Sequence, residues 1–367
     1  MNVENMIYAY LAICFAMIVF NTVCIFVFRR REKRITKRSQ HLEERVERQI
    51  EQMVDGGEPD EGHKNYLARH LRKAGNLLAF DETLDRLGQQ KPEAVDAYLD
   101  AIYPVFVQLM MEYNRKDEVL VAFYLHILEK HHVLYGKPVG LIHEVVQTLI
   151  HSPGIYCRGN ALQAVLSGGN ADSVVTALAA LDEGGHYYNS KIISDSLLTF
   201  PGDASSLDRR LWERLDRFSL PMQVAILNYF RFRSDEHRER MLALLTDETR
   251  DDEVRFSAIR YFGKYADPRV HPLLMNFADP ALAARWEYTA VACAALGIYP
   301  GKHTVDLLKT NLHSSNWYIR FNAAQSLETI GFDYVDMADI FEGSDRFARE
   351  MLQYRMDKRR EKQEAVL

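Results

Sequence analysis

The stretches DEVRFSAIRYF at residues 252–262 and YIRFNAAQSLETIG at residues 318–331 decide the fold. Each carries an arginine early in an apolar pattern of helical spacing. Similar stretches recur from about residue 150, with aligned positions 33, 32, 32, 31 and 34 residues apart: Arg158, Lys191, Gln223, Arg255, Trp286 and Arg320. A fixed period of about 20–50 residues with two helices per unit is typical of an α-solenoid, in which each helix pair buries its apolar face on its neighbours.

The rest of the chain after residue 62 also has helical patterns, without sustained period-2 alternation. Each recurring stretch is followed by a turn and a second, leucine-rich helix, as in EHRERMLALLTDE and TVDLLKTNL. Upstream, residues 94–113 and 117–135 are strongly apolar; Pro92 and Asp117 suit helix starts, and Pro104 is expected to kink the first of them. We therefore predict an all-α fold, with a helical part at 63–150, repeats at 151–345 and a basic C-terminal helix or tail at 346–367.

The repeats resemble a known family, the HEAT repeats, in particular the short bacterial type. The residues that carry the resemblance are Val254, Arg255 and Ala258, then Ile319, Arg320, Ala323 and Ala324, and the helix-ending Gly297 and Gly331. It is clear over 250–342, fair over 150–250 and faint before that. The resemblance implies that Arg158, Arg255 and Arg320 are structural, part of a ladder between units. Lys191, Gln223 and Trp286 depart from the motif, which suggests an irregular solenoid.

An apolar segment opens the chain: residues 6–28 form 23 residues without a charge. As a helix this segment would span about 34 Å, enough to cross a membrane. No Lys or Arg precedes it and RRREKRITKR follows at 29–38, which favours an uncleaved anchor over a signal peptide. The positive-inside rule then places the N-terminus outside and the HEAT-like domain in the cytosol of a single-pass cell-membrane protein, with residues 1–28 as anchor.

The anchor and its basic flank carry the first candidate contacts. Ala12, Ala16 and Asn21 could support helix–helix contact in lipid, although one small-residue step also occurs by chance. The basic side chains are expected to lie on the anionic inner leaflet, or simply to set the topology: Arg29, Arg30, Arg31, Lys33, Arg34, Lys37 and Arg38.

Residues 29–62 are expected to form the basic stretch, a stalk helix and a linker. Leu42, Val46, Ile50 and Met53 make one apolar stripe within 39–54. This stripe predicts either a short coiled coil or, by preference, a solvated stalk helix. The sequence DGGEPDEG at 55–62 reads as a linker.

Charge argues against nucleic acid as a partner. The chain has 45 basic and 51 acidic residues, and without residues 1–38 the counts are 38 and 49, a net charge of -11. A body of this charge is repelled by phosphate backbones.

No motif predicts catalysis, a cofactor, a metal or a small-molecule substrate. The string GIYPGKHT at 297–304 lacks P-loop spacing, and His126, His131 and His132 lack zinc-ligand spacing. They are expected to be helix-face residues. Cys157 and Cys293 lie on apolar helices and are expected to be buried, inert thiols.

Some proteins with HEAT-type folds are enzymes. The deoxyhypusine hydroxylases hold iron with repeated His-Glu dyads, whereas this chain has one, His143-Glu144. The HEAT-type DNA glycosylases use a basic groove, and the phycobilin lyases are soluble. A lyase or metalloenzyme therefore remains the least favoured alternative, and the protein is not expected to be an enzyme.

The sequence thus favours a membrane-tethered cytosolic scaffold that binds a protein partner, such as a membrane-associated enzyme or envelope-assembly complex; a glycosyltransferase is a guess that rests on no residue. Candidate contacts are polar residues of the second helices: Arg209, Arg210, Glu213, Arg240, His271, Asn276, Lys309 and His313. The alternative is a signalling or regulatory protein that relays through its transmembrane helix. With five residues before Met6, such a relay would depend on lateral contacts.

Overall fold

The fold is all-helical. The computed structural model describes residues 3–54, 57–185, 188–282 and 285–364, and these ranges hold twenty α-helices, two short 3-10 helices and no β-strand. The prediction of an all-α chain is confirmed. The chain divides into two compact units: unit 1 runs to Gly184 and includes 201–203, and unit 2 comprises 185–200 and 204–367. This division falls inside the predicted repeats, not at residue 150.

The helices of unit 1 are α1 (Val3–Val54), α2 (Glu61–His70), α3 (Ala74–Gln90), α4 (Pro92–Ala101), α5 (Tyr103–Tyr113), α6 (Glu118–Lys130), α7 (Leu141–Leu149), α8 (Ile155–Ser167) and α9 (Ala171–Glu183). Those of unit 2 are α10 (Ser190–Leu198), α11 (Ala204–Arg214), η1 (Leu215–Arg217), α12 (Leu220–Arg233), α13 (Arg238–Thr246), α14 (Asp252–Phe262), α15 (His271–Ala278), α16 (Trp286–Ala295), η2 (Leu296–Ile298), α17 (Lys302–Leu312), α18 (Trp317–Ile330), α19 (Ala338–Glu342) and α20 (Arg346–Glu364).

Prolines and capping side chains set several helix boundaries. The Asp117 carboxylate accepts a hydrogen bond from the backbone N–H of Leu120 and so caps α6, as the sequence predicts. Pro104 does more than kink its helix: α4 ends at Ala101, α5 begins at Tyr103, and the two helices meet at 64°. A proline near the first position of α5 is tolerated because the N–H it lacks would have no partner there.

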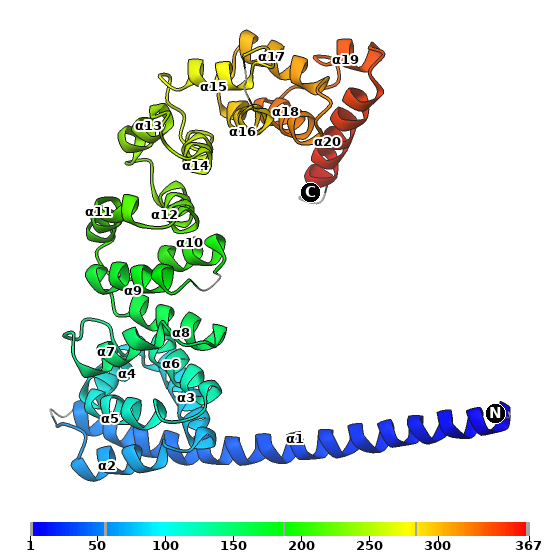
Figure 1. Ribbon diagram of the computed structural model, residues 1–367. Coiled ribbons are helices and arrows are strands. Elements are labelled where there is room, and N and C mark those ends of the chain that lie inside the picture. Colours follow the sequence, from blue (N-terminus) through cyan, green and yellow to red (C-terminus); the bar gives the residue numbers. More distant parts are fainter. Residues whose placement is uncertain (1–2, 55–56, 186–187, 283–284, 365–367) are drawn as a thin grey trace. The chain divides into compact units, whose positions relative to one another are not determined.

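Helix α1 is a single unbroken helix of 52 residues, about 78 Å long (Figure 1). Its segment Tyr10–Val27 has a mean hydropathy of 2.4 and none of it is buried. Among the described residues, α1 is the one individual helix that is long and apolar enough to cross a membrane, and a signal sequence would meet the same criterion. The first part of α1 extends away from the other helices of unit 1 (Figure 1).

The last part of α1 belongs to the core of unit 1, which corrects the expected solvated stalk. Leu42, Val46 and Ile50 are between 0 and 4% exposed and lie on the face of α1 that packs against α3. The Thr83 hydroxyl donates to the Ser39 carbonyl at 3.0 Å across this contact. The apolar stripe is therefore real, but its partner is a neighbouring helix of the same chain.

Unit 2 repeats one packing scheme. Each even-numbered helix packs on the next even-numbered helix, from α10 and α12 through to α18 and α20, and α13, α15 and α17 pack on the even-numbered helix that follows each of them. The pair Tyr229–Phe230 in α12 recurs as Tyr261–Phe262 in α14, and all four rings are buried. Helices α12 and α14 thus bury equivalent residues at equivalent positions.

His63 connects three helices of unit 1. Its ring is fully buried, its Nε2 lies 2.6 Å from the Tyr98 hydroxyl on α4, and its Nδ1 accepts from Arg45 Nε of α1 at 3.4 Å. Burial and the nearby Arg45 guanidinium lower the pKa of His63 to about 4. The folded protein therefore holds this ring neutral where an exposed histidine would be protonated.

Replacing Ile50 tests whether α1 belongs to the core. Ile50→Ala should reduce the free energy of unfolding by about 2–4 kcal/mol, because a buried side chain is lost. Glu51→Ala, one residue on and exposed, should change it by less than about 0.5 kcal/mol. Denaturant unfolding of the full chain in detergent measures both. If both substitutions changed the free energy of unfolding by equal, small amounts, residues 39–54 would be a solvated stalk helix after all.

The neutral state of His63 predicts a pH dependence. Because its folded pKa lies below the unfolded value, stability should fall as the pH drops from about 6.5 towards 4, by at most about 3 kcal/mol from this group. Between pH 7 and pH 4.5, the free energy of unfolding of His63→Gln should fall by about 2–3 kcal/mol less than that of the wild type. His126→Gln, at an exposed position of unit 1, should behave like the wild type. An unchanged pH profile in His63→Gln would contradict the assignment.

Candidate functional site

The predicted partner-binding residues lie on α11, α13, α15 and α17 of unit 2, or directly after α17. On α11, Arg209, Arg210 and Glu213 are exposed, and Arg210 forms an ion pair with Glu213 at 3.5 Å. Arg240 on α13 lies over the Trp212 ring, 5.4 Å from its centroid. Asn276 on α15 is exposed. These residues form the more accessible part of the predicted set.

The other three predicted residues connect neighbouring helices. His271 Nε2 lies 2.9 Å from the Thr304 hydroxyl of α17. Lys309 Nζ pairs with Asp339 of α19 at 2.8 Å. His313 Nδ1 lies 2.8 Å from Asp345, the residue before α20. Such contacts hold consecutive helix pairs together, so these side chains have a structural role whether or not a partner reaches them.

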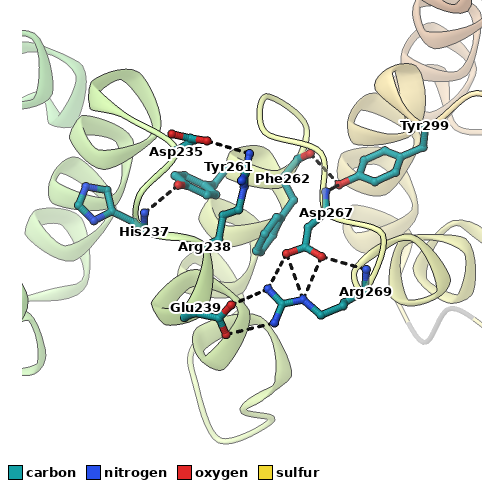
Figure 2. Close-up of polar contacts among 9 residues, drawn as sticks. All are labelled: Asp235, His237, Arg238, Glu239, Tyr261, Phe262, Asp267, Arg269 and Tyr299. Atoms are coloured by element: carbon teal, nitrogen blue, oxygen red, sulfur yellow. Dashed lines mark hydrogen bonds and ion pairs between the residues drawn. The ribbon is translucent and has the colours of Figure 1, made fainter.

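Buried tyrosine hydroxyls tie the turns of adjacent helix pairs together (Figure 2). Tyr261 Oη accepts from the backbone N–H of His237 at 3.1 Å. It also donates to the Ser234 carbonyl at 3.1 Å. Tyr299 Oη accepts from the N–H of Asp267 at 3.1 Å and donates to the Phe262 carbonyl at 3.0 Å. Each hydroxyl satisfies backbone groups that would otherwise be buried without partners.

Arg269 forms the most extensive ion-pair contact beside these tyrosines. Its guanidinium reaches Glu239 Oε1 of α13 at 2.6 Å and Asp267 Oδ2 at 2.7 Å (Figure 2). Hydrogen bonds from Arg269 lower the pKa of both carboxyl groups. Arg269 thus joins α13 to the loop before α15, a cross-link that the sequence pattern did not single out.

Arg158 and Arg320 bind the turns that precede their own helices, and Arg255 binds the last turn of the preceding helix, α13. Arg158 donates to the carbonyls of Ser152 and Pro153 at 2.9 and 2.7 Å, Arg320 donates to those of Ser314 and Ser315 at 2.6 and 3.0 Å, and Arg255 reaches the Leu245 carbonyl at 3.2 Å. Their structural role agrees with the expectation. Two of them also contact neighbouring helices: Arg255 lies 5.6 Å from the Phe277 ring of α15 and 5.1 Å from the Tyr288 ring of α16, and Arg320 lies 5.4 Å from the Phe347 ring of α20.

The structure corrects the register of two repeats. These arginines occupy the fourth position of α8, α14 and α18, whereas Trp286 is the first residue of α16 and Thr289 is the fourth. Likewise, Lys191 is the second residue of α10, and Ile193 is the fourth. Arg349, at the fourth position of α20, donates to the Gly343 carbonyl at 2.9 Å in the same way. The repeat pattern in the sequence did not include it, because residues 346–367 were expected to form a basic C-terminal helix or tail outside the repeats.

Exposed aromatic rings gather at the first turns of α16, α18 and α20. We call Trp286, Trp317, Tyr318 and Phe347 the aromatic stripe; these side chains are 47, 50, 58 and 64% exposed. The Trp286 and Tyr318 rings stack at 5.9 Å, and Trp317 meets Tyr318 edge-on at 5.2 Å. Arg320 lies 5.4 Å from the Phe347 ring. The sequence feature that could have indicated this stripe is the presence of tryptophan and tyrosine at helix starts, where polar residues usually face the solvent.

Unit 1 contains a cleft with acidic walls between α3, α4 and the turn after α6. A cavity of about 290 Å³ and a neighbouring one of about 340 Å³ share four lining residues, and we call the pair the acidic cleft. The shared residues are Asp96, Leu99, His131 and His132; Asp85 and Lys130 line one side, and Asp100, Val133, Tyr135 and Pro201 line the other.

A lysine fills the one metal-like cluster found among the described residues. Asp81, Asp85 and His131 place their ligand atoms within 4.8 Å of one another. Lys130 Nζ pairs with Asp81 at 2.8 Å and with Asp85 at 2.6 Å, and His131 Nε2 lies 2.7 Å from Asp81. Burial would raise the pKa of Asp81, but hydrogen bonds from His131 and Lys130 outweigh it and hold that pKa below its usual value. The ammonium group thus takes the place of a bound cation.

The three histidines of HILEKHH do not form a site together. His126 is exposed and lies 3.2 Å from Glu129, whereas His131 faces Asp81. His132 has φ 48°, the left-handed conformation that ends α6 through the bond from Val133 N–H to the Leu128 carbonyl. This turn directs the chain so that His131, His132, Val133 and Tyr135 line the cleft.

The predicted contact residues of α1 whose side chains the structure describes are all exposed to solvent. Ala12, Ala16 and Asn21 are exposed, and so are Arg30, Lys33 and Lys37. The side chains of the other predicted membrane-surface residues, Arg29, Arg31, Arg34 and Arg38, lie outside the described residues.

Two further expectations agree with the structure. Cys157 and Cys293 are 1 and 0% exposed, and burial raises the pKa of Cys293 to about 12, which keeps this thiol protonated. The glycine-containing string at 297–304 spans the end of η2 and the start of α17 and forms a turn between helices.

No protein-family model matches the chain, and no curated protein matches it in sequence.

Proposed function

We propose that the protein is a membrane-anchored scaffold that recruits a protein partner to a HEAT-like α-solenoid. The helix-on-helix packing of alternate helices and the arginines that hold the turns before α8, α18 and α20 support the solenoid and its likeness to bacterial HEAT repeats. The apolar segment Tyr10–Val27 supports a single-pass anchor in the cell membrane. The partner class we favour is a membrane-associated enzyme or an envelope-assembly complex.

The basic flank supports an orientation with both units in the cytosol. Arg30, Lys33 and Lys37 are exposed directly after the apolar segment. Side chains of this kind attract the anionic inner leaflet, with about 1 kcal/mol for each base near the surface. Anchoring also raises the local concentration of the domain for other membrane proteins.

The observation that carries partner binding is the aromatic stripe. Two of the three tryptophans of the chain are about half exposed there, at helix starts where they add little to the core. Exposed aromatic residues of this size are enriched where protein interfaces derive most of their binding energy. The stripe is therefore a better docking surface than the second-helix residues, several of which are tied to neighbouring helices.

The second candidate function is a relay through the transmembrane helix, and the continuity of α1 favours it. No break separates the apolar segment from Leu42, Val46 and Ile50, which are fixed in unit 1. A rotation of the span would therefore turn the attached unit, whereas a flexible stalk would absorb it. Ala12, Ala16 and Asn21 are the lateral contacts through which such a relay would act.

Replacing stripe residues should remove the partner. Trp317→Ala together with Tyr318→Ala should lower the amount of partner crosslinked and co-purified from native membranes at least about tenfold, because hot-spot aromatics often contribute 2 kcal/mol or more each. Val335→Ala, an exposed apolar residue outside the stripe, is the control. Full binding by the double variant would refute the stripe. If partner binding were lost instead on replacing the exposed second-helix residues, the docking surface would lie on those helices. These residues are Arg209, Arg210, Glu213, Arg240 and Asn276.

Insertions in the basic stretch distinguish the relay from the tether. One alanine inserted after Lys33 should rotate unit 1 by about 100° relative to the span, and seven residues should nearly restore the phase. A relay predicts that the single insertion abolishes partner recruitment and that the seven-residue insertion restores it. If both variants recruited the partner equally well in the same co-purification, the relay would be excluded and the segment would act as a membrane tether.

A further inference from the structure

We propose that the acidic cleft of unit 1 binds an arginine side chain presented by a protein partner. The inference rests on the proposed scaffold function, because it supplies the partner. It adds a second, polar contact of stated chemistry, on residues that are separate from the aromatic stripe.

The charges of the cleft favour a cation. Four carboxylates stand in or beside its walls, from Asp81, Asp85, Asp96 and Asp100, and two internal ammonium groups pair with three of them: Lys130 with Asp81 and Asp85, and Lys137 with Asp100 at 2.5 Å. Asp96 is exposed on α4 and has no ion-pair or hydrogen-bond partner among the described residues. The cleft therefore retains uncompensated negative charge, with Asp96 as its accessible carboxylate.

The apolar and aromatic walls select the kind of cation. Leu99 and Val133 are buried beneath the cavity and give it an aliphatic floor, and Tyr135 presents a ring that is 52% exposed. An arginine can lay its methylene stem on such a floor, place its planar guanidinium by a tyrosine ring and bind a carboxylate with two parallel hydrogen bonds. A small inorganic cation would use the carboxylates alone.

The surroundings also direct cations to this unit. Residues 39–184 contain 22 acidic and 13 basic residues, so most of the negative charge of the body lies in unit 1. A field of this sign speeds the approach of basic segments and repels anionic ligands. A divalent metal ion is disfavoured at the adjacent cluster because Lys130 already occupies the space between Asp81 and Asp85.

The test uses arginine amide as the probe and the full chain in detergent micelles. Histidine carbon-bound protons, observed by NMR in histidine-labelled protein, report on His131 and His132 at the cleft. Arginine amide should shift these signals saturably, whereas citrulline amide, which has the same α-amino group and an isosteric but uncharged side chain, should not. Asp96→Asn should weaken binding at least about fivefold, since the accessible carboxylate is lost.

Glu93→Gln is the matched control, because Glu93 is an exposed carboxylate of the same helix that does not line the cleft. It should bind arginine amide as the wild type does. Equal shifts with arginine amide and citrulline amide, or unchanged binding by Asp96→Asn, would overturn the proposal. Because the probe needs no partner, this outcome is independent of whether the stripe variants lose theirs.

Discussion

The burial of one face of α1 against α3 is the contact on which the organisation of unit 1 depends. Leu42, Val46 and Ile50 fill the core there, and the same helix continues without interruption into the apolar segment. A separate anchor joined by a flexible linker would let the domain move independently of the span. Here the apolar segment and the core of unit 1 share one helix, so whatever holds the apolar segment also holds α2, α3 and α4.

Unit 2 depends on a different device, the repetition of one set of contacts. The Tyr-Phe pairs of α12 and α14 fill equivalent places in the core, tyrosine hydroxyls satisfy the backbone of neighbouring turns, and fourth-position arginines hold the turns before their own helices. Because these tasks are met by buried or partly buried groups, the first turns of α16, α18 and α20 are left free to carry aromatic residues that stability does not require.

Much of the fold could be predicted from the sequence, since helical periodicity, capping residues and a 23-residue uncharged segment are local signals. The packing of residues 39–54 could not be predicted, because an apolar stripe of four side chains does not show which helix covers it. The cluster of Lys130 with Asp81 joins residues 49 apart that share no local pattern. The repeat pattern also predicted the wrong register for Trp286. A spacing of about 32 residues defines the repeat but not the exact position within each helix. Trp286 lies three residues before Thr289, which occupies the fourth position of α16.

The continuity of α1 also has a consequence for how the chain can be made and handled. The apolar segment is synthesised before α2 to α4, so the core of unit 1 assembles on a helix whose far end has already left the ribosome. Cutting the chain at residue 62, at the end of the linker that the sequence predicts, would remove one wall of that core. The remainder would expose the apolar faces of Leu84 and Leu87 on α3, among others, and would be prone to aggregate. A soluble form must therefore begin ahead of Ser39.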